Sequence, residues 1–145
     1  MFGKAYDALT PGGYFEMQDF VFPFEYIDEP PTESLLYKWF QIISEGAAKL
    51  GRPWTNVPKY KQWFEEIGFE DVMEKRFYWP INAWAKGKYY KQISVYAQTN
   101  FQNGMEGMSL KIMGSMGWSA EEIQIFLAGV RDDVRNTKIH CYCPV

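Results

Sequence analysis

Cysteine and histidine are scarce in this sequence. Its 145 residues contain two cysteines, Cys141 and Cys143, and a single histidine, His140. A closed structural zinc site usually needs four such ligands, and no second cluster occurs in the chain, so we expect no metal site. Two cysteines separated by one residue also have a poor geometry for a disulfide, which favours reduced thiols. His140 has no visible partner that would make it a general base.

An excess of positive charge is absent as well. The chain has 15 Lys and Arg against 18 Asp and Glu, a net charge of -3, and an isoelectric point of about 5.2. Nonspecific nucleic-acid binding depends on a positive field, so we expect no nucleic-acid partner. Apolar runs such as residues 125–128 are far shorter than the roughly 20 residues of a membrane span, so no membrane contact is expected. The first residues carry no secretory signal, which predicts an intracellular protein of the cytoplasm or nucleus.

Two motif classes are also missing. No G-x-S-x-G nucleophile elbow occurs, which disfavours a hydrolase of that type. Gly12 and Gly13 follow a helical segment and open a strand, whereas a phosphate-binding loop follows a strand and opens a helix. This pair is therefore interpreted as a turn.

Apolar and aromatic residues, in contrast, are abundant. Hydrophobic residues make up 47% of the chain and aromatic residues 19%, which is enough for the core of one domain. The periodicity of apolar residues alternates between helical and extended segments, which predicts an α/β fold. Helices are expected over residues 3–9, 32–50 with Thr32 as the N-cap, 58–67, 119–136 with a Ser119–Glu122 capping box, and two within 82–116 separated near Gly104 and Gly107; strands are expected over 14–22, 69–79 and 138–145.

Three residues are candidates for a substrate-binding site. Gln18 and Asp19 stand near the carboxyl end of the first predicted strand, the end at which open α/β sheets bind ligands. An equally good alternative is that Asp19 only begins a loop. Trp54 follows a loop with glycine and proline and lies outside the helical stripes, whereas Trp84 and the other tryptophans on stripes are expected to fill the core.

Several blocks of the sequence resemble a known family. The run from Leu9 to Glu16 is similar to the L-x-PGG turn of class I S-adenosylmethionine-dependent methyltransferases. The more specific resemblance is to the C-terminal half of fungal LaeA-like methyltransferases, and it is carried in order by residues 13–19, 51–53, 68–72, 79–82, 117–122 and 139–142.

The resemblance implies a Rossmann-like sheet with strand order 3-2-1-4-5-7-6 and an antiparallel last strand. Residues 14–22 would then be strand five, 69–79 strand six and 138–145 the start of strand seven, with helical insertions at 23–57 and 82–136. The family binds S-adenosylmethionine through a glycine-rich loop after strand one and an acid after strand two, and neither has a match here. Residues 1–145 would therefore be the substrate-side part, without the N-terminal cofactor-binding half, without cofactor-binding residues and inactive alone.

The resemblance thus implies part of a fungal methyltransferase of secondary metabolism, with an unknown methyl acceptor. An alternative is a non-catalytic interaction module, in which residues 14–22 form an unpaired sheet edge that binds a protein partner. A third reading is a small-molecule binding protein that uses its tryptophan-rich surface.

Overall fold

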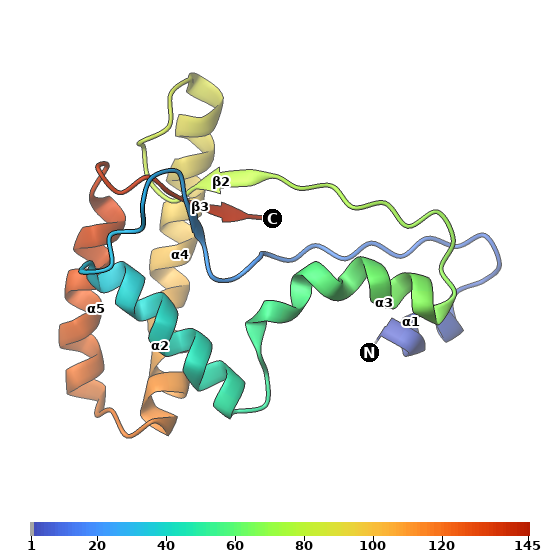
Figure 1. The fold of residues 1–145 in the computed structure, drawn as a ribbon, viewed down its shortest axis with the longest axis horizontal. Coiled ribbons are helices and arrows are strands. Elements are labelled where there is room, and N and C mark those ends of the chain that lie inside the picture. Colours follow the sequence, from blue (N-terminus) through green and yellow to red (C-terminus); the bar gives the residue numbers. More distant parts are fainter. Residues whose placement is uncertain (1) are drawn as a thin grey trace.

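The fold combines a small sheet with three long helices and a separate pair of short ones (Figure 1). The structure is a computed structural model and describes residues 2–145. Helices α2, α4 and α5 pack together beside the sheet, while α1 and α3 lie at the far end of two long extended segments. In chain order the elements are α1 (Phe2–Ala8), β1 (Glu25–Tyr26), α2 (Leu35–Lys49), the 3-10 helix η1 (Trp54–Lys59), α3 (Tyr60–Ile67), β2 (Tyr78–Pro80), α4 (Lys88–Ser115), α5 (Ala120–Arg135) and β3 (Cys141–Pro144).

The sheet has the order β1-β3-β2, and β3 is antiparallel to both neighbours. The pairing extends slightly beyond the assigned strands. Val21 donates its N–H to the carbonyl of Pro144 at 2.8 Å, and Phe77 exchanges two backbone hydrogen bonds with Val145 at 2.7 and 2.8 Å. The last residues of the chain are therefore held from both sides.

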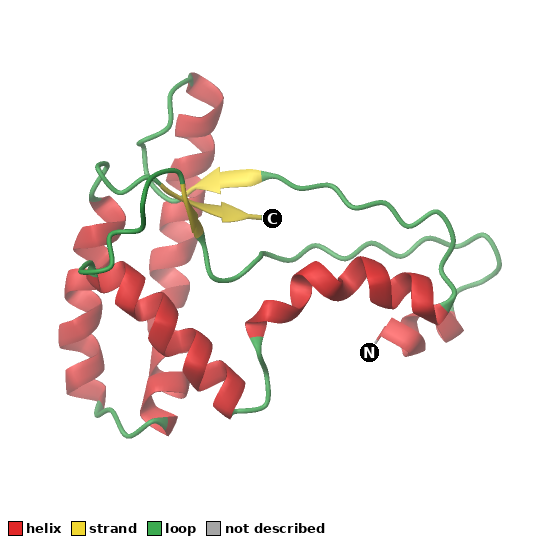
Figure 2. Ribbon diagram, viewed as in Figure 1, coloured by secondary structure: helices red, strands yellow, loops and turns green. Residues whose placement is uncertain are grey.

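The two longest predicted strands are mostly wrong as strands. Residues 14–21 and 72–77 are extended but make no ladder with each other, and only Tyr78–Pro80 of the second run is a strand (Figure 2). Residues 70–71 form a bend, in which Asp71 has φ of 53°. The aromatic and β-branched residues of both runs favour extended backbone, as expected. A strand also needs a hydrogen-bonded neighbour, and residues 2–145 offer one only near Val21 and Phe77.

The predicted break within residues 82–116 is also wrong. Lys88–Ser115 is one continuous helix in spite of Gly104 and Gly107. A glycine inside a helix lowers the stability of the helix by about 1 kcal/mol. The buried side chains of Phe101, Met105 and Ile112 pack in the core and offset that cost. Residues 82–87 form the loop before the helix, so Trp84 lies on this loop and not on a helical stripe.

Local signals at the helix ends were more reliable. Ser119 and Glu122 form the predicted capping box, with hydrogen bonds of 2.8 and 3.2 Å. Gly68 ends α3 in the left-handed conformation, with φ of 112°. The start of α2 differs by two residues, because Ser34 and not Thr32 is the N-cap and accepts the N–H of Tyr37 at 3.1 Å.

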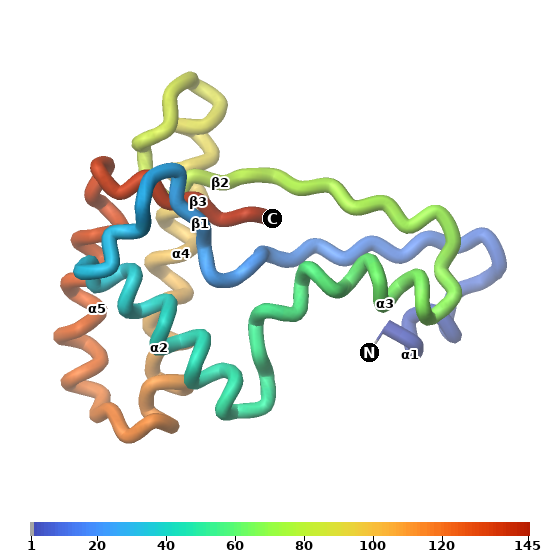
Figure 3. Tube along the Cα trace, viewed as in Figure 1, coloured from blue at the N-terminus to red at the C-terminus, as the bar shows by residue number. Residues whose placement is uncertain are grey.

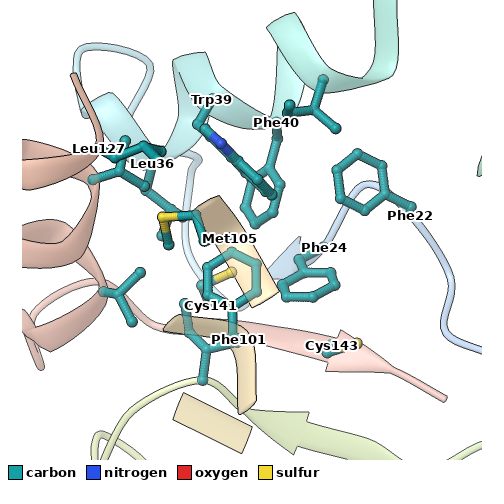
Figure 4. Close-up of a cluster of buried hydrophobic side chains, with 14 of the residues drawn as sticks. Phe22, Phe24, Leu36, Trp39, Phe40, Phe101, Met105, Leu127, Cys141 and Cys143 are labelled. Atoms are coloured by element: carbon teal, nitrogen blue, oxygen red, sulfur yellow. The ribbon is translucent and has the colours of Figure 1, made fainter. Parts of the chain in front are cut away.

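The core lies between the sheet and helices α2, α4 and α5 (Figure 4). Trp39, Phe40 and Met105 have at most 1% of their surface exposed, and Cys141 from β3 meets them from the sheet side. The indole N–H of Trp39 is satisfied by Ser109 Oγ at 2.8 Å, so burial leaves no orphaned donor there.

A second, smaller cluster holds α1 and α3 together. We call it the distal aromatic cluster: Phe2, Tyr6, Phe15, Tyr60, Trp63, Phe64 and Phe69, whose neighbouring rings lie 4.8 to 6.5 Å apart. Figure 3 shows that the two extended segments connect helices α1 and α3 with the sheet.

Candidate functional site

A large groove runs between the two extended segments. Its volume is about 790 Å³, and residues 16–22 and 72–77 form its two long sides. Tyr60 and Phe64 of α3 and Phe101 of α4 contribute to its lining, and Cys143 and Val145 lie at its sheet end. We call this cavity the central groove.

All three sequence-predicted site residues line the central groove. Gln18 and Asp19 come from the first extended segment, and Trp54 comes from the start of η1. Trp54 lies edge-on to Phe22, with ring centroids 5.1 Å apart, and is half-buried. The sequence singled out Gln18 and Asp19 by a predicted strand end and Trp54 by its loop. The predicted strand end is not a strand in the structure, and the three residues line one cavity.

Asp19 is the most constrained polar group of the three. Its Oδ1 accepts the N–H of Phe20 at 2.9 Å, and its Oδ2 accepts the hydroxyl of Tyr60 at 3.1 Å. The Gln18 amide instead donates to Glu16 Oε1 at 2.7 Å. Asp19 therefore has a fixed orientation, and its carboxylate keeps lone pairs for a further donor.

Tyr60 is a groove residue that sequence reasoning missed. Burial raises the pKa of its hydroxyl, and the nearby Asp19 carboxylate raises it further. The phenol therefore stays protonated and holds Asp19 in place at neutral pH. Tyr60 lies within the helix expected over residues 58–67, and its contact with Asp19, 41 residues away, forms only in the folded chain.

The cysteine and histidine residues at the chain's end point in different directions. Cys141 and Cys143 are buried on the core side, where burial raises the pKa of the Cys143 thiol to about 12. His140 lies on the other side and pairs with Asp28, a partner 112 residues away that the sequence did not reveal. Within residues 2–145 no group of three or more His, Cys, Asp or Glu side chains is arranged to hold a metal ion.

No helix within residues 2–145 combines the length and the apolar character that a membrane crossing demands.

The sequence is similar to those of fungal methyltransferases. The chain is 30% identical over 147 residues to the probable methyltransferase tdiE of Emericella nidulans, covering 100% of this chain and 46% of that protein. It is 27% identical to the methyltransferase pytC of Aspergillus terreus, covering 94% and 43%. No protein-family model and no solved structure matches the chain.

Regulators of secondary metabolism form a second group of relatives. The regulator laeA of Fusarium oxysporum is 25% identical over 150 residues, which is 100% of this chain and 47% of that protein. The chain is thus homologous to the C-terminal part of fungal LaeA-like methyltransferases, as the sequence blocks indicated. It spans less than half the length of each of these three relatives.

The residues described do not fit an S-adenosylmethionine site of the family's kind. Such a site needs a strand that leads through a glycine-rich turn into a helix. Within residues 2–145, the loop from β1 to α2 has no glycine, and the loop from β2 to α4 has only Gly87 at the helix start. No contact with the cofactor is therefore assigned to this chain.

Proposed function

We propose that residues 1–145 form the acceptor side of an S-adenosylmethionine-dependent methyltransferase and that the cofactor-binding half lies outside them. The homology to the C-terminal part of methyltransferases carries this proposal. The central groove, with Gln18, Asp19 and Trp54, would hold the unknown methyl acceptor. The 145 residues alone would then be inactive, because methyl transfer requires the cofactor and the acceptor to be aligned.

The strand order supports this assignment. In the family template, strand seven lies between strands five and six and runs antiparallel to them. The observed order β1-β3-β2 has the same pattern, with β3 antiparallel in the centre. We therefore assign residues 14–26 to the strand-five region, 69–80 to strand six and 141–144 to strand seven of a Rossmann-like sheet.

The accessible surface supports a missing neighbour. The chain exposes 9607 Å², whereas a compact monomer of 17.0 kDa exposes about 7,700 Å² by the usual scaling with mass. The excess of about 1,900 Å² is larger than the roughly 800 Å² that one partner contributes to a standard interface. A further domain or subunit would cover such a surface.

Asp19 is the residue best placed to orient the acceptor. Tyr60 and the backbone of Phe20 fix its carboxylate, and its remaining lone pairs can accept a hydroxyl or amine proton of a bound molecule. Trp54 offers an aromatic edge at the same groove. This combination suits an acceptor with both a ring and a polar donor.

Calorimetric titration of the chain with S-adenosylmethionine tests the proposal. We expect no micromolar binding by residues 1–145, and we expect binding by a chimera in which they replace the matching region of tdiE. Micromolar binding by the isolated chain would contradict the absence of the cofactor half. A folded chimera without cofactor binding would contradict the assignment as the acceptor side.

A second candidate is a module that accepts a β-strand from a partner protein. Within residues 2–145, backbone groups of 14–20 and 70–76 have no backbone partner, and both segments border the central groove. A strand from a partner protein could lie between the two segments, in line with β3 and antiparallel to both. It would form backbone hydrogen bonds with each segment, as the end of β3 does with Val21 and Val145 does with Phe77.

Light scattering after size-exclusion chromatography tests the second candidate. Open edges predict self-association at high concentration, which Met17→Pro would reduce by removing one edge donor. A monomer at all concentrations with cooperative unfolding would contradict it.

A further inference from the structure

A second cavity lies on the outer face of the sheet. Its volume is about 440 Å³, and it shares no lining residue with the central groove. Its walls include four aromatic residues, Tyr78, Trp84, Tyr90 and Tyr142. Tyr142 alternates with Cys141 and Cys143 along β3, so it points away from the core that holds the two cysteines. We call this cavity the outer aromatic pocket.

A buried asparagine, Asn82, holds the loop that carries Trp84. Asn82 has 1% of its surface exposed. Its amide donates to the carbonyls of Asn136 at 3.2 Å and Ile139 at 3.3 Å, and its Oδ1 accepts the N–H of Trp84 at 3.1 Å. A side chain with these three bonds holds the loop in one conformation, so the pocket exists before any ligand arrives.

The ring of Trp84 is itself held in place. Its Nε1 donates to the carbonyl of Cys141 at 2.8 Å, and the His140 ring lies 5.2 Å away at an angle of 38°. Tyr142, which also lines the pocket, donates its hydroxyl to Glu25 Oε2 at 2.7 Å and meets Tyr78 edge-on at 5.5 Å. Because the polar atoms of Trp84 and Tyr142 are already bonded, these side chains offer a ligand their rings.

Charge is supplied by a single lining residue. Within the part of the chain that the structure describes, Lys86 is the only ionised side chain that lines the pocket, and it forms no ion pair. Two acids beside the lining residues are already engaged: Glu25 accepts the hydroxyl of Tyr142, and Asp28, which follows the lining residue Ile27, pairs with His140. The pocket thus combines aromatic walls with one free cation.

We propose that the outer aromatic pocket binds a planar aromatic carboxylate, with its ring stacked between Trp84 and the tyrosines and its anion paired with Lys86. The volume lies in the range of small-molecule sites, about 300–1,000 Å³. Aromatic rings favour offset or edge contacts with a planar ligand, and a lysine at the rim favours an anion over a cation. This site is independent of the methyltransferase assignment.

The test uses 2-naphthoate as the probe and 2-naphthylmethylamine as its cationic counterpart. Isothermal titration should show binding of the carboxylate and at least about tenfold weaker binding of the amine. Lys86→Gln should weaken the carboxylate about tenfold, while Lys88→Gln, outside the lining, should leave it unchanged. Tyr90→Ala should weaken both probes, and its neighbour Tyr89→Ala should weaken neither.

The proposal would be overturned by no binding of 2-naphthoate, by equal affinity for both probes, or by equal effects of Lys86→Gln and Lys88→Gln. Asp19→Asn locates the site, since it alters the central groove alone. Loss of naphthoate binding in that variant would place the ligand in the groove and also overturn the proposal. Thermal unfolding of every variant checks that each remains folded.

Discussion

At the scale of single residues, the fold depends on contacts between positions far apart in sequence. Asp133 of α5 is an example, because its Oδ2 accepts the N–H of Leu36 at 3.0 Å in the first turn of α2. An acidic group at a helix N-terminus satisfies a free donor and interacts favourably with the helix dipole. No local pattern could predict this contact, because the two residues are 97 positions apart.

Replacing Asp133 should therefore destabilise the protein. We expect Asp133→Ala to lower the free energy of unfolding by about 1–2 kcal/mol. Asp132→Ala is the matched control, because within residues 2–145 that exposed carboxylate pairs only with Arg135 on the same helix. Urea unfolding measures both, and equal effects of the two changes would contradict the capping role.

Tyr142 gives a prediction for alkaline pH. Its hydrogen bond to Glu25, together with partial burial, raises the pKa of the phenol from 10.0 to about 12. A raised pKa means that the contribution to stability is complete below pH 10 and is lost as the pH rises toward 12. Urea unfolding measured between pH 10 and 12 should show a smaller loss of unfolding free energy for Tyr142→Phe than for the unchanged protein. The same pH dependence in both proteins would contradict the raised pKa of Tyr142.

The predicted site shows how far single residues can be interpreted from sequence. Gln18, Asp19 and Trp54 line the same groove, although the predicted strand end that singled out Gln18 and Asp19 is not a strand in the structure. Tyr60 and Asp28 were missed, because each acts through one distant partner. Their roles depend on tertiary contacts that one sequence does not display.

At the scale of elements, the start of α5 was predictable, whereas the start of α2 and the continuity of α4 were not. The Ser119–Glu122 capping box is complete within four residues, so it can be recognised locally. The course of α4 through Gly104 and Gly107 depends on packing against α2 and α5. Gly46 of α2 marks one close approach, since a Cβ there would overlap Ile112 of α4 and lie 2.8 Å from Met116 Sδ.

This close approach predicts opposite effects for two glycine substitutions. Gly46→Ala should lower the free energy of unfolding by about 1–3 kcal/mol through overpacking, in spite of the better helix propensity of alanine. Gly107→Ala has open space around its Cβ and should raise the free energy by about 0.5–1 kcal/mol. Urea unfolding measures both variants. If both substitutions changed the free energy of unfolding in the same direction, the close contact between α2 and α4 at Gly46 would be contradicted.

At the scale of the whole molecule, the extended segments give an open shape (Figure 1). The sequence predicted extended backbone for both segments, and one alternative left residues 14–22 with an unpaired edge. Strand composition does not show whether a partner strand is present, so the lack of any ladder along most of both segments was not predicted. A compact chain of 145 residues has a radius of gyration of about 15 Å. Small-angle scattering of the monomer should give a larger value, and a value of about 15 Å would contradict the open arrangement.

The distal aromatic cluster has a consequence for local unfolding. Helix α3 has no fully buried residue, and α1 has only Phe2 at 9% exposure, whereas α2, α4 and α5 contain residues at 0%. A unit with so little buried surface opens at a lower free energy than the main core. Native-state hydrogen exchange should therefore show two classes of amide, with α1 and α3 exchanging long before the helices of the core.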